Sequence, residues 1–261
     1  MPFRHPKWDP DNLPPDNLDW DGISSIADIF TGGHIYRYPS FFKNLYCYPA
    51  FASILEDAQH IHKADVEERI VDRLKKFTQL LASKEENIYD FDEKVDYDFV
   101  MIDTSPRIGP LTTASIRASS HVIIPADLEE FGTKAIEGML FTVACEKQLR
   151  SKDDPIEIAG IIPNKVVRRV PHHKSIFKKL RSINGSENWL LPPVIERGIY
   201  GALAMESRAP KSVFDLPPSH PARKESELWC SIVYERVFNK KVIDCSEILD
   251  NFFATRGVTT P

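Results

Sequence analysis

The chain has 261 residues, of which 42% are apolar and 27% are charged, and it carries a formal charge of −5. This composition is ordinary for a globular protein, and the length suits one large α/β domain or two small ones. The four cysteines are scattered, which argues against a disulfide framework or zinc site and favours reduced thiols in a cytosolic protein. The longest apolar runs have the length of strands, so we expect no segment to span a membrane.

The first part of the chain begins with residues 1–22, which are rich in Asp, Asn and Pro and are expected to form a flexible leader. A short helix at 25–30 and a strand at 44–49 follow. Apolar residues between Val66 and Leu81 recur at spacings of three and four, which predicts an amphipathic helix.

After the acidic linker 85–96, strand patterns alternate with helix patterns. Strands are predicted at 98–103, 121–125, 156–162 and 190–195, and helices at about 111–119, 132–149 and 171–183. This alternation predicts an α/β fold, with a mostly parallel sheet and helices on both faces. We expect a closing helix around 228–237 and another near 244–254, which divides the chain into a leader (1–22), an α/β domain (23–242) and a C-terminal helix and tail (243–261).

The apolar run from Phe99 to Ile102 ends in Asp103 and then in a turn formed by Thr104, Ser105 and Pro106. A buried parallel strand that delivers a carboxylate to its C-terminal edge has this pattern, and ligands of open α/β sheets collect at such edges. A carboxylate there can hold magnesium, usually through water. The alternative is an aspartate that only caps the following turn.

Residues 97–138 resemble the Walker B and switch II region of the ParA/MinD-type partition ATPases, and a weaker similarity extends over about 23–240. The matching positions are Asp103, Ser105-Pro106, Gly109, Leu111-Thr112 and Pro125. The resemblance implies a P-loop NTPase (SIMIBI-like) architecture that uses ATP and Mg²⁺. Asp103 would be the magnesium residue, and Thr104 to Pro106 the catalytic switch.

The same resemblance places Asn164 and Pro193 on the adenine side of the nucleotide. An Asn after a strand is also a common turn former, so both interpretations of Asn164 stay open. The Gly-Lys-Ser/Thr motif of the phosphate-binding loop does not occur in the sequence. In the family this loop precedes all the matched segments, so we expect an N-terminally incomplete fold. The chain is then a short version of an ordinary ATPase or a degenerate relative that does not hydrolyse ATP.

The segment between Ile158 and Ser186 contains seven Lys or Arg residues and no Asp or Glu. On a helix from Pro171, Lys174, Lys178 and Arg181 would share one face, which could neutralise phosphates without reading sequence. The alternative is a solvated helix face. A catalytic or metal-binding pair at His172 and His173 is not expected, because adjacent helical residues point in different directions. The predicted DNA-binding residues are Lys165, Arg168, Arg169, Lys174, Lys178 and Arg181.

By resemblance, the protein would be an ATP-dependent, DNA-binding dimer switch of plasmid or chromosome partition, cytoplasmic and associated with the nucleoid. Its partners would be non-specific DNA, a ParB-like centromere-binding protein and a second copy of the chain. The main alternative is a nucleotide-free pseudo-ATPase or scaffold that binds DNA or a partner protein. A membrane positioner is disfavoured because the tail at 246–253 is acidic, whereas interfacial helices are basic. Cysteine placement disfavours an iron-protein reductase.

Overall fold

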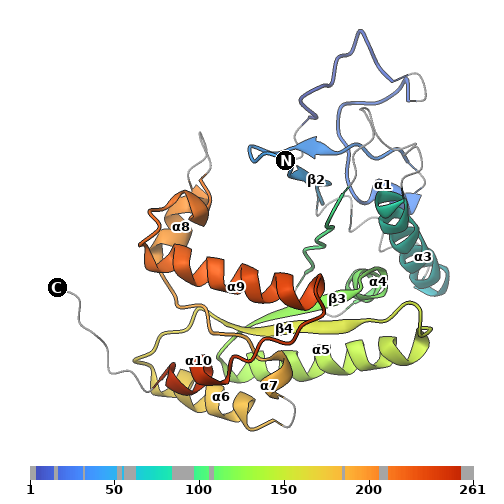
Figure 1. Ribbon diagram of the computed structural model, residues 1–261. Coiled ribbons are helices and arrows are strands. Elements are labelled where there is room, and N and C mark those ends of the chain that lie inside the picture. Colours follow the sequence, from blue (N-terminus) through green and yellow to red (C-terminus); the bar gives the residue numbers. More distant parts are fainter. Residues whose placement is uncertain are drawn as a thin grey trace. The chain divides into compact units, whose positions relative to one another are not determined.

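The computed structural model describes residues 4–14, 17–31, 33–51, 55, 63–83, 97–105, 109–183, 186–205 and 211–253. The chain divides into two compact units, residues 1–119 and residues 120–261. Figure 1 follows the elements of both units along the chain. Among the described residues, no helix is long and apolar enough to cross a membrane.

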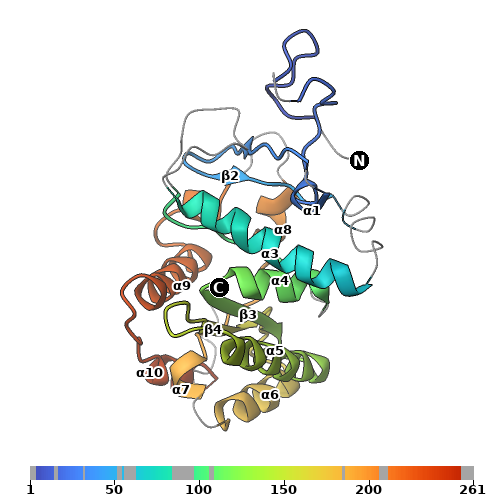
Figure 2. The same cartoon turned by 90° about the vertical axis from the view of Figure 1, so that its right-hand side faces the viewer.

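The N-terminal unit combines a small antiparallel hairpin with packed helices. Its elements are α1 (Asp28–Thr31), β1 (Tyr38–Pro39), β2 (Tyr46–Cys47), α3 (Lys63–Ala82) and α4 (Pro110–Ala118). Tyr38 of β1 lies opposite Cys47 of β2. Leu74, Phe77 and Leu81 of α3 share a core with Ala114 of α4, and Figure 2 shows these two helices one above the other. The helices predicted at 66–81 and 111–119 are confirmed, because an apolar stripe on α3 packs against a neighbouring helix.

The described part of the segment 1–22 is mostly loop and turn, but it contains buried side chains. His5 and Trp20 are both buried, and their rings lie 5.7 Å apart. Nε2 of His5 lies 2.8 Å from the carbonyl oxygen of Arg37, which precedes β1. The ring of His5 also lies 4.7 Å from that of Tyr38 in β1, so a hydrogen bond and an aromatic contact join this segment to the hairpin.

The C-terminal unit is built on the parallel strands β3 (His121–Asp127) and β4 (Glu157–Asn164), with Asp127 opposite Asn164. The chain near 190–196 runs beside the other edge of β4. The amide of Leu191 donates a hydrogen bond of 2.9 Å to the carbonyl oxygen of Ile161. The amide of Val166 donates one of 2.9 Å to the carbonyl oxygen of Val194. This third segment forms two isolated parallel bridges, so the strand predicted at 190–195 is present only in irregular form.

Helices cover both faces of these strands. They are α5 (Glu130–Leu149), α6 (Pro171–Arg181), α7 (Ser186–Trp189), α8 (Gly198–Met205), the 3-10 turn η1 (Val213–Asp215), α9 (Pro221–Val237) and α10 (Ser246–Asn251). In Figures 1 and 2, α5 lies on one face and α9 on the other. The core between them includes Ile124, Ile161, Leu191 and Ile232. The predicted α/β class with a parallel sheet is confirmed.

The strand predicted at 98–103 is wrong. Residues 97–105 form an irregular segment with no strand. Phe99 is 46% and Met101 74% exposed, whereas the prediction required a buried apolar run. An apolar run becomes a parallel strand only where a neighbouring backbone supplies its hydrogen bonds, and no strand of the described residues pairs with this segment.

Candidate functional site

The predicted magnesium carboxylate lies on the irregular segment of the N-terminal unit. Asp103, Thr104 and Ser105 are exposed, and Pro106 lies outside the described residues. The start of the segment is fixed at Tyr97, whose hydroxyl accepts a hydrogen bond of 3.2 Å from Nη1 of Arg37. The segment therefore presents a carboxylate and two hydroxyl groups to solvent between Tyr97 and α4.

The carboxyl edge of the C-terminal unit brings together the predicted adenine-side residues. Asn164 ends β4 and is half-buried, and Pro193 is buried in the adjacent segment. The amide of Val194 donates to the carbonyl of Pro163 at 2.8 Å, which holds the two stretches side by side. Two positions predicted from separate motifs therefore meet at one sheet edge, where α/β folds bind ligands.

Lys165 follows Asn164 directly after the end of β4. It adopts the left-handed conformation, with φ 49. Its Nζ lies 3.3 Å from Oδ2 of Asp127, the last residue of β3. The pair is exposed, so it contributes little to stability. Lys165 was predicted to bind DNA, and here its charge is shared with Asp127, a residue that the sequence did not single out.

Glu129, in the loop between β3 and α5, contacts both histidines of α6. Its Oε1 lies 3.4 Å from Nε2 of His173, and its Oε2 lies 3.6 Å from Nε2 of His172. The Nδ1 atom of the buried His173 accepts the amide hydrogen of Val167 at 3.0 Å. The proton of the neutral ring must therefore sit on Nε2, facing Glu129. The sequence missed this arrangement, because only tertiary packing brings Glu129 to the start of α6.

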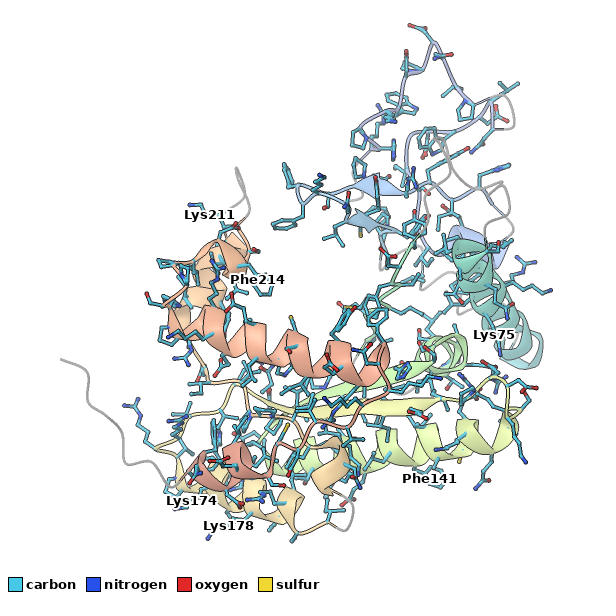
Figure 3. All side chains as sticks on the ribbon, viewed as in Figure 1. Lys75, Phe141, Lys174, Lys178, Lys211 and Phe214 are labelled. Carbon is cyan, nitrogen blue, oxygen red and sulfur yellow. The ribbon has the colours of Figure 1, made fainter. Side chains whose placement is uncertain are left out.

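The basic residues in α6 and just before it separate into two groups. Lys174 and Lys178 are exposed, and Figure 3 shows both extending outward from the helix, away from the strands. Arg181 instead forms an ion pair with Asp250 of α10. Arg168 lies just before α6, with its guanidinium carbon 4.5 Å from the ring centre of Phe252.

Arg169, before α6, and Lys179, within it, are also exposed. Buried Ile176, Phe177 and Leu180 fix the opposite face of α6 in the core, so the helix can hold its lysines in a constant orientation. The structure therefore brings Lys174 and Lys178 into one row and gives two of the predicted arginines protein partners.

A second polar cluster holds the chain after Pro193. Glu225 of α9 accepts hydrogen bonds from the Ile195 amide at 3.3 Å and from the Tyr200 hydroxyl at 3.0 Å. Nη2 of Arg197 lies 3.4 Å from the same carboxylate. Burial, together with the negative charge of Glu225, raises the pKa of Tyr200 above its ordinary value. The cluster fixes the chain near 190–196 beside α9. No local sequence motif predicted this cluster.

Comparison with known proteins shows what this chain is similar to. The sequence model of AAA_31, an AAA domain, matches residues 56–154. Protein IncC of Escherichia coli is 31% identical over 77 residues, which cover 30% of this chain and 21% of IncC. The chromosome-partitioning ATPase Soj of Treponema pallidum is 27% identical over 123 residues, which cover 47% of each chain.

Solved structures with the same fold include a putative plasmid partition protein from Borrelia burgdorferi bound to AMPPNP. It has a TM-score of 0.58 and 16% identity over 82% of this chain and 74% of its own. The cobyrinic acid a,c-diamide synthase of Mycobacterium smegmatis, with bound ADP and magnesium, has a TM-score of 0.56 and 18% identity over 92% of this chain and 80% of its own. The resemblance to the ParA/MinD-type partition ATPases is confirmed. The chain spans about half or less of the length of IncC and Soj, and at these identities the solved structures show the fold alone.

The residues present fit part of the ligand set of the ParA/MinD-type ATPases. The Asp103 carboxylate and the hydroxyls of Thr104 and Ser105 are hard oxygen donors, of the kind that Mg²⁺ prefers. Asn164 offers an amide donor and acceptor at a sheet edge, as an adenine-side contact requires. The sequence contains no Gly-Lys-Ser/Thr, so it lacks the motif that holds the β- and γ-phosphates in P-loop proteins.

Proposed function

We propose that this chain is a ParA-like protein of plasmid or chromosome partition that binds DNA without sequence preference through α6. The observation that carries this proposal is the row of exposed lysines, Lys174 and Lys178, on a helix that has no acidic residue. Lysines one turn apart can follow a phosphate backbone, and their charge does not depend on the base sequence.

ATP and Mg²⁺ are the ligands that control this binding in our proposal, with a dimer as the form that binds DNA. Asp103 would hold the magnesium, with Thr104 to Pro106 beside it, and Asn164 and Pro193 would flank the adenine. Bound magnesium supplies positive charge that neutralises the phosphates of the nucleotide. A ParB-like centromere-binding protein would stimulate ATP hydrolysis and release of DNA, and the protein would act in the cytoplasm on the nucleoid.

The test is a titration of the protein into a fluorescent DNA duplex of mixed sequence, with and without ATP and Mg²⁺. The variant K174A/K178A should lose most of its affinity. The control variant K147A/K152A removes two exposed lysines from another part of the same unit and should bind like the wild type. Equal binding by both variants would contradict the role of α6.

The same titration separates the switch from a second candidate function, a scaffold that binds DNA without nucleotide. The exposure of Asp103 on a segment that is not a strand favours this alternative, because a magnesium carboxylate normally ends a fixed strand. Binding that strengthens with ATP and Mg²⁺ supports the switch. Binding that is equal with and without nucleotide supports the scaffold.

A further inference from the structure

The helix α10 brings an acidic and an aromatic side chain onto the basic segment around α6. Asp250 of α10 pairs with Arg181 at the end of α6. Phe252, directly after α10, lies against the guanidinium of Arg168 at 4.5 Å from the ring centre to the guanidinium carbon. Two of the predicted DNA-binding arginines are thus occupied by one short stretch of the same chain.

Hydrophobic packing keeps this stretch in place. Leu249 and Phe252 are buried in the core of the C-terminal unit. The ring of Phe177 of α6 lies 5.9 Å from that of Phe252 and 5.2 Å from that of Phe253, between ring centres. Asp250 itself is exposed, and its buried neighbours Leu249 and Phe252 fix the position of its backbone.

We propose that α10 is an intramolecular competitor for the phosphates that bind α6. This inference rests on the proposed function, because it concerns the same DNA-binding surface. The guanidinium fork of Arg181 suits a carboxylate and a phosphate equally well. While Asp250 occupies it, Arg181 is held by a carboxylate, whereas the lysines of α6 are exposed to a phosphate backbone. Once the carboxylate is neutralised, Arg181 extends the lysine row by one turn.

The variant D250N tests this competition, because asparagine keeps the shape of the side chain and removes its charge. The control is E247Q, which removes one negative charge from the exposed Glu247 of the same helix. DNA affinity of D250N should rise about fivefold over wild type at 0.1 M salt, and the slope of log K against log salt should steepen by about 0.9, as for one added phosphate contact. E247Q should change neither quantity by a comparable amount.

A third variant shows whether the gain acts through the arginine. In an R181A background, D250N should give no increase in affinity. If D250N and E247Q behave alike, or if the gain persists without Arg181, the competition is overturned.

The outcomes distinguish this inference from the proposed function. Wild-type binding that depends on Lys174 and Lys178 with no effect of D250N overturns only the competition. DNA binding that appears only in D250N supports both the DNA-binding surface on α6 and the competition by Asp250. The absence of binding by both wild type and D250N overturns both proposals.

Discussion

The guanidinium of Arg236 in α9 donates a hydrogen bond of 2.8 Å from Nη1 to the carbonyl oxygen of Ala159 in β4. Arg236 is only 7% exposed, and burial lowers its pKa. Its Nη2 lies 3.4 Å from the carbonyl oxygen of Ile243, ahead of α10. One buried side chain therefore joins α9 to the central strand and to the segment that leads to α10.

Replacement of Arg236 by Ala should lower the free energy of unfolding by about 2–3 kcal/mol, because it leaves one buried and one partly buried carbonyl group without this charged donor. The measurement is urea unfolding followed by circular dichroism. The exposed Lys224 of the same helix provides the control, since K224A should change the free energy by less than about 0.5 kcal/mol. Equal stability of R236A and wild type would contradict this role for Arg236.

Gly160 in β4 is a position where no side chain fits. A Cβ there would lie 2.3 Å from Cδ1 of the buried Leu191. G160A should therefore destabilise the fold by about 1–3 kcal/mol through overpacking. At Gly201 in α8 an added Cβ meets nothing within 4 Å, so G201A should stabilise the fold by about 0.5–1 kcal/mol. Thermal unfolding of both variants checks the prediction, and a loss of stability in G201A as large as that in G160A would contradict it.

His121, at the start of β3, should make stability depend on pH. Burial lowers its pKa below the ordinary value of 6.5, nearby Lys240 acts in the same direction, and Glu157 partly opposes both. The unfolded chain then binds the proton more readily, so the free energy of unfolding falls as the pH drops below about 6.5. H121Q should lose less stability than wild type between pH 7.5 and 5.5 in urea unfolding. Identical losses in both proteins would show that His121 does not contribute.

Asp103 should matter for ligand binding and not for folding. Because its side chain is exposed on an irregular segment, D103A should unfold like the wild type. If Asp103 holds magnesium, D103A should weaken magnesium-dependent binding of a fluorescent ATP analogue by about tenfold or more, or about 1.4 kcal/mol. The control D98A removes an exposed carboxylate from the same segment. Equal affinity of D103A and D98A would exclude Asp103 from the site.

The helices were predicted from a local signal, and the parallel strands β3 and β4 were also predicted, because each supplies hydrogen bonds to the other. The apolar stripe from Val66 to Leu81 determines a helix because each side chain needs only a partner on one side, and α3 follows it. The run 98–103 carries an equally clear apolar signal, yet a strand also needs hydrogen-bonding neighbours that are far away in sequence. For this reason the same kind of reasoning succeeded for α3 and failed at Phe99 to Asp103.

The candidate site shows the same limit. Helical spacing predicted that Lys174, Lys178 and Arg181 share one face of α6, and both lysines are exposed. It could not show that Arg181 meets Asp250, because the two residues are 69 positions apart. The contacts of Glu129 with His172 and His173 were missed for the same reason. Spacing along one element identifies a face, and only the tertiary structure shows which charges on that face are already paired.

The salt dependence of DNA binding by wild type and K174A/K178A tests most sharply whether α6 binds DNA. If the two lysines contact phosphates, their removal should reduce the slope of log K against log salt by about 1.8, because each contact contributes about 0.9. Affinity should fall equally for duplexes of different sequence, since phosphate contacts carry no base information. An unchanged slope in K174A/K178A would contradict DNA binding through α6.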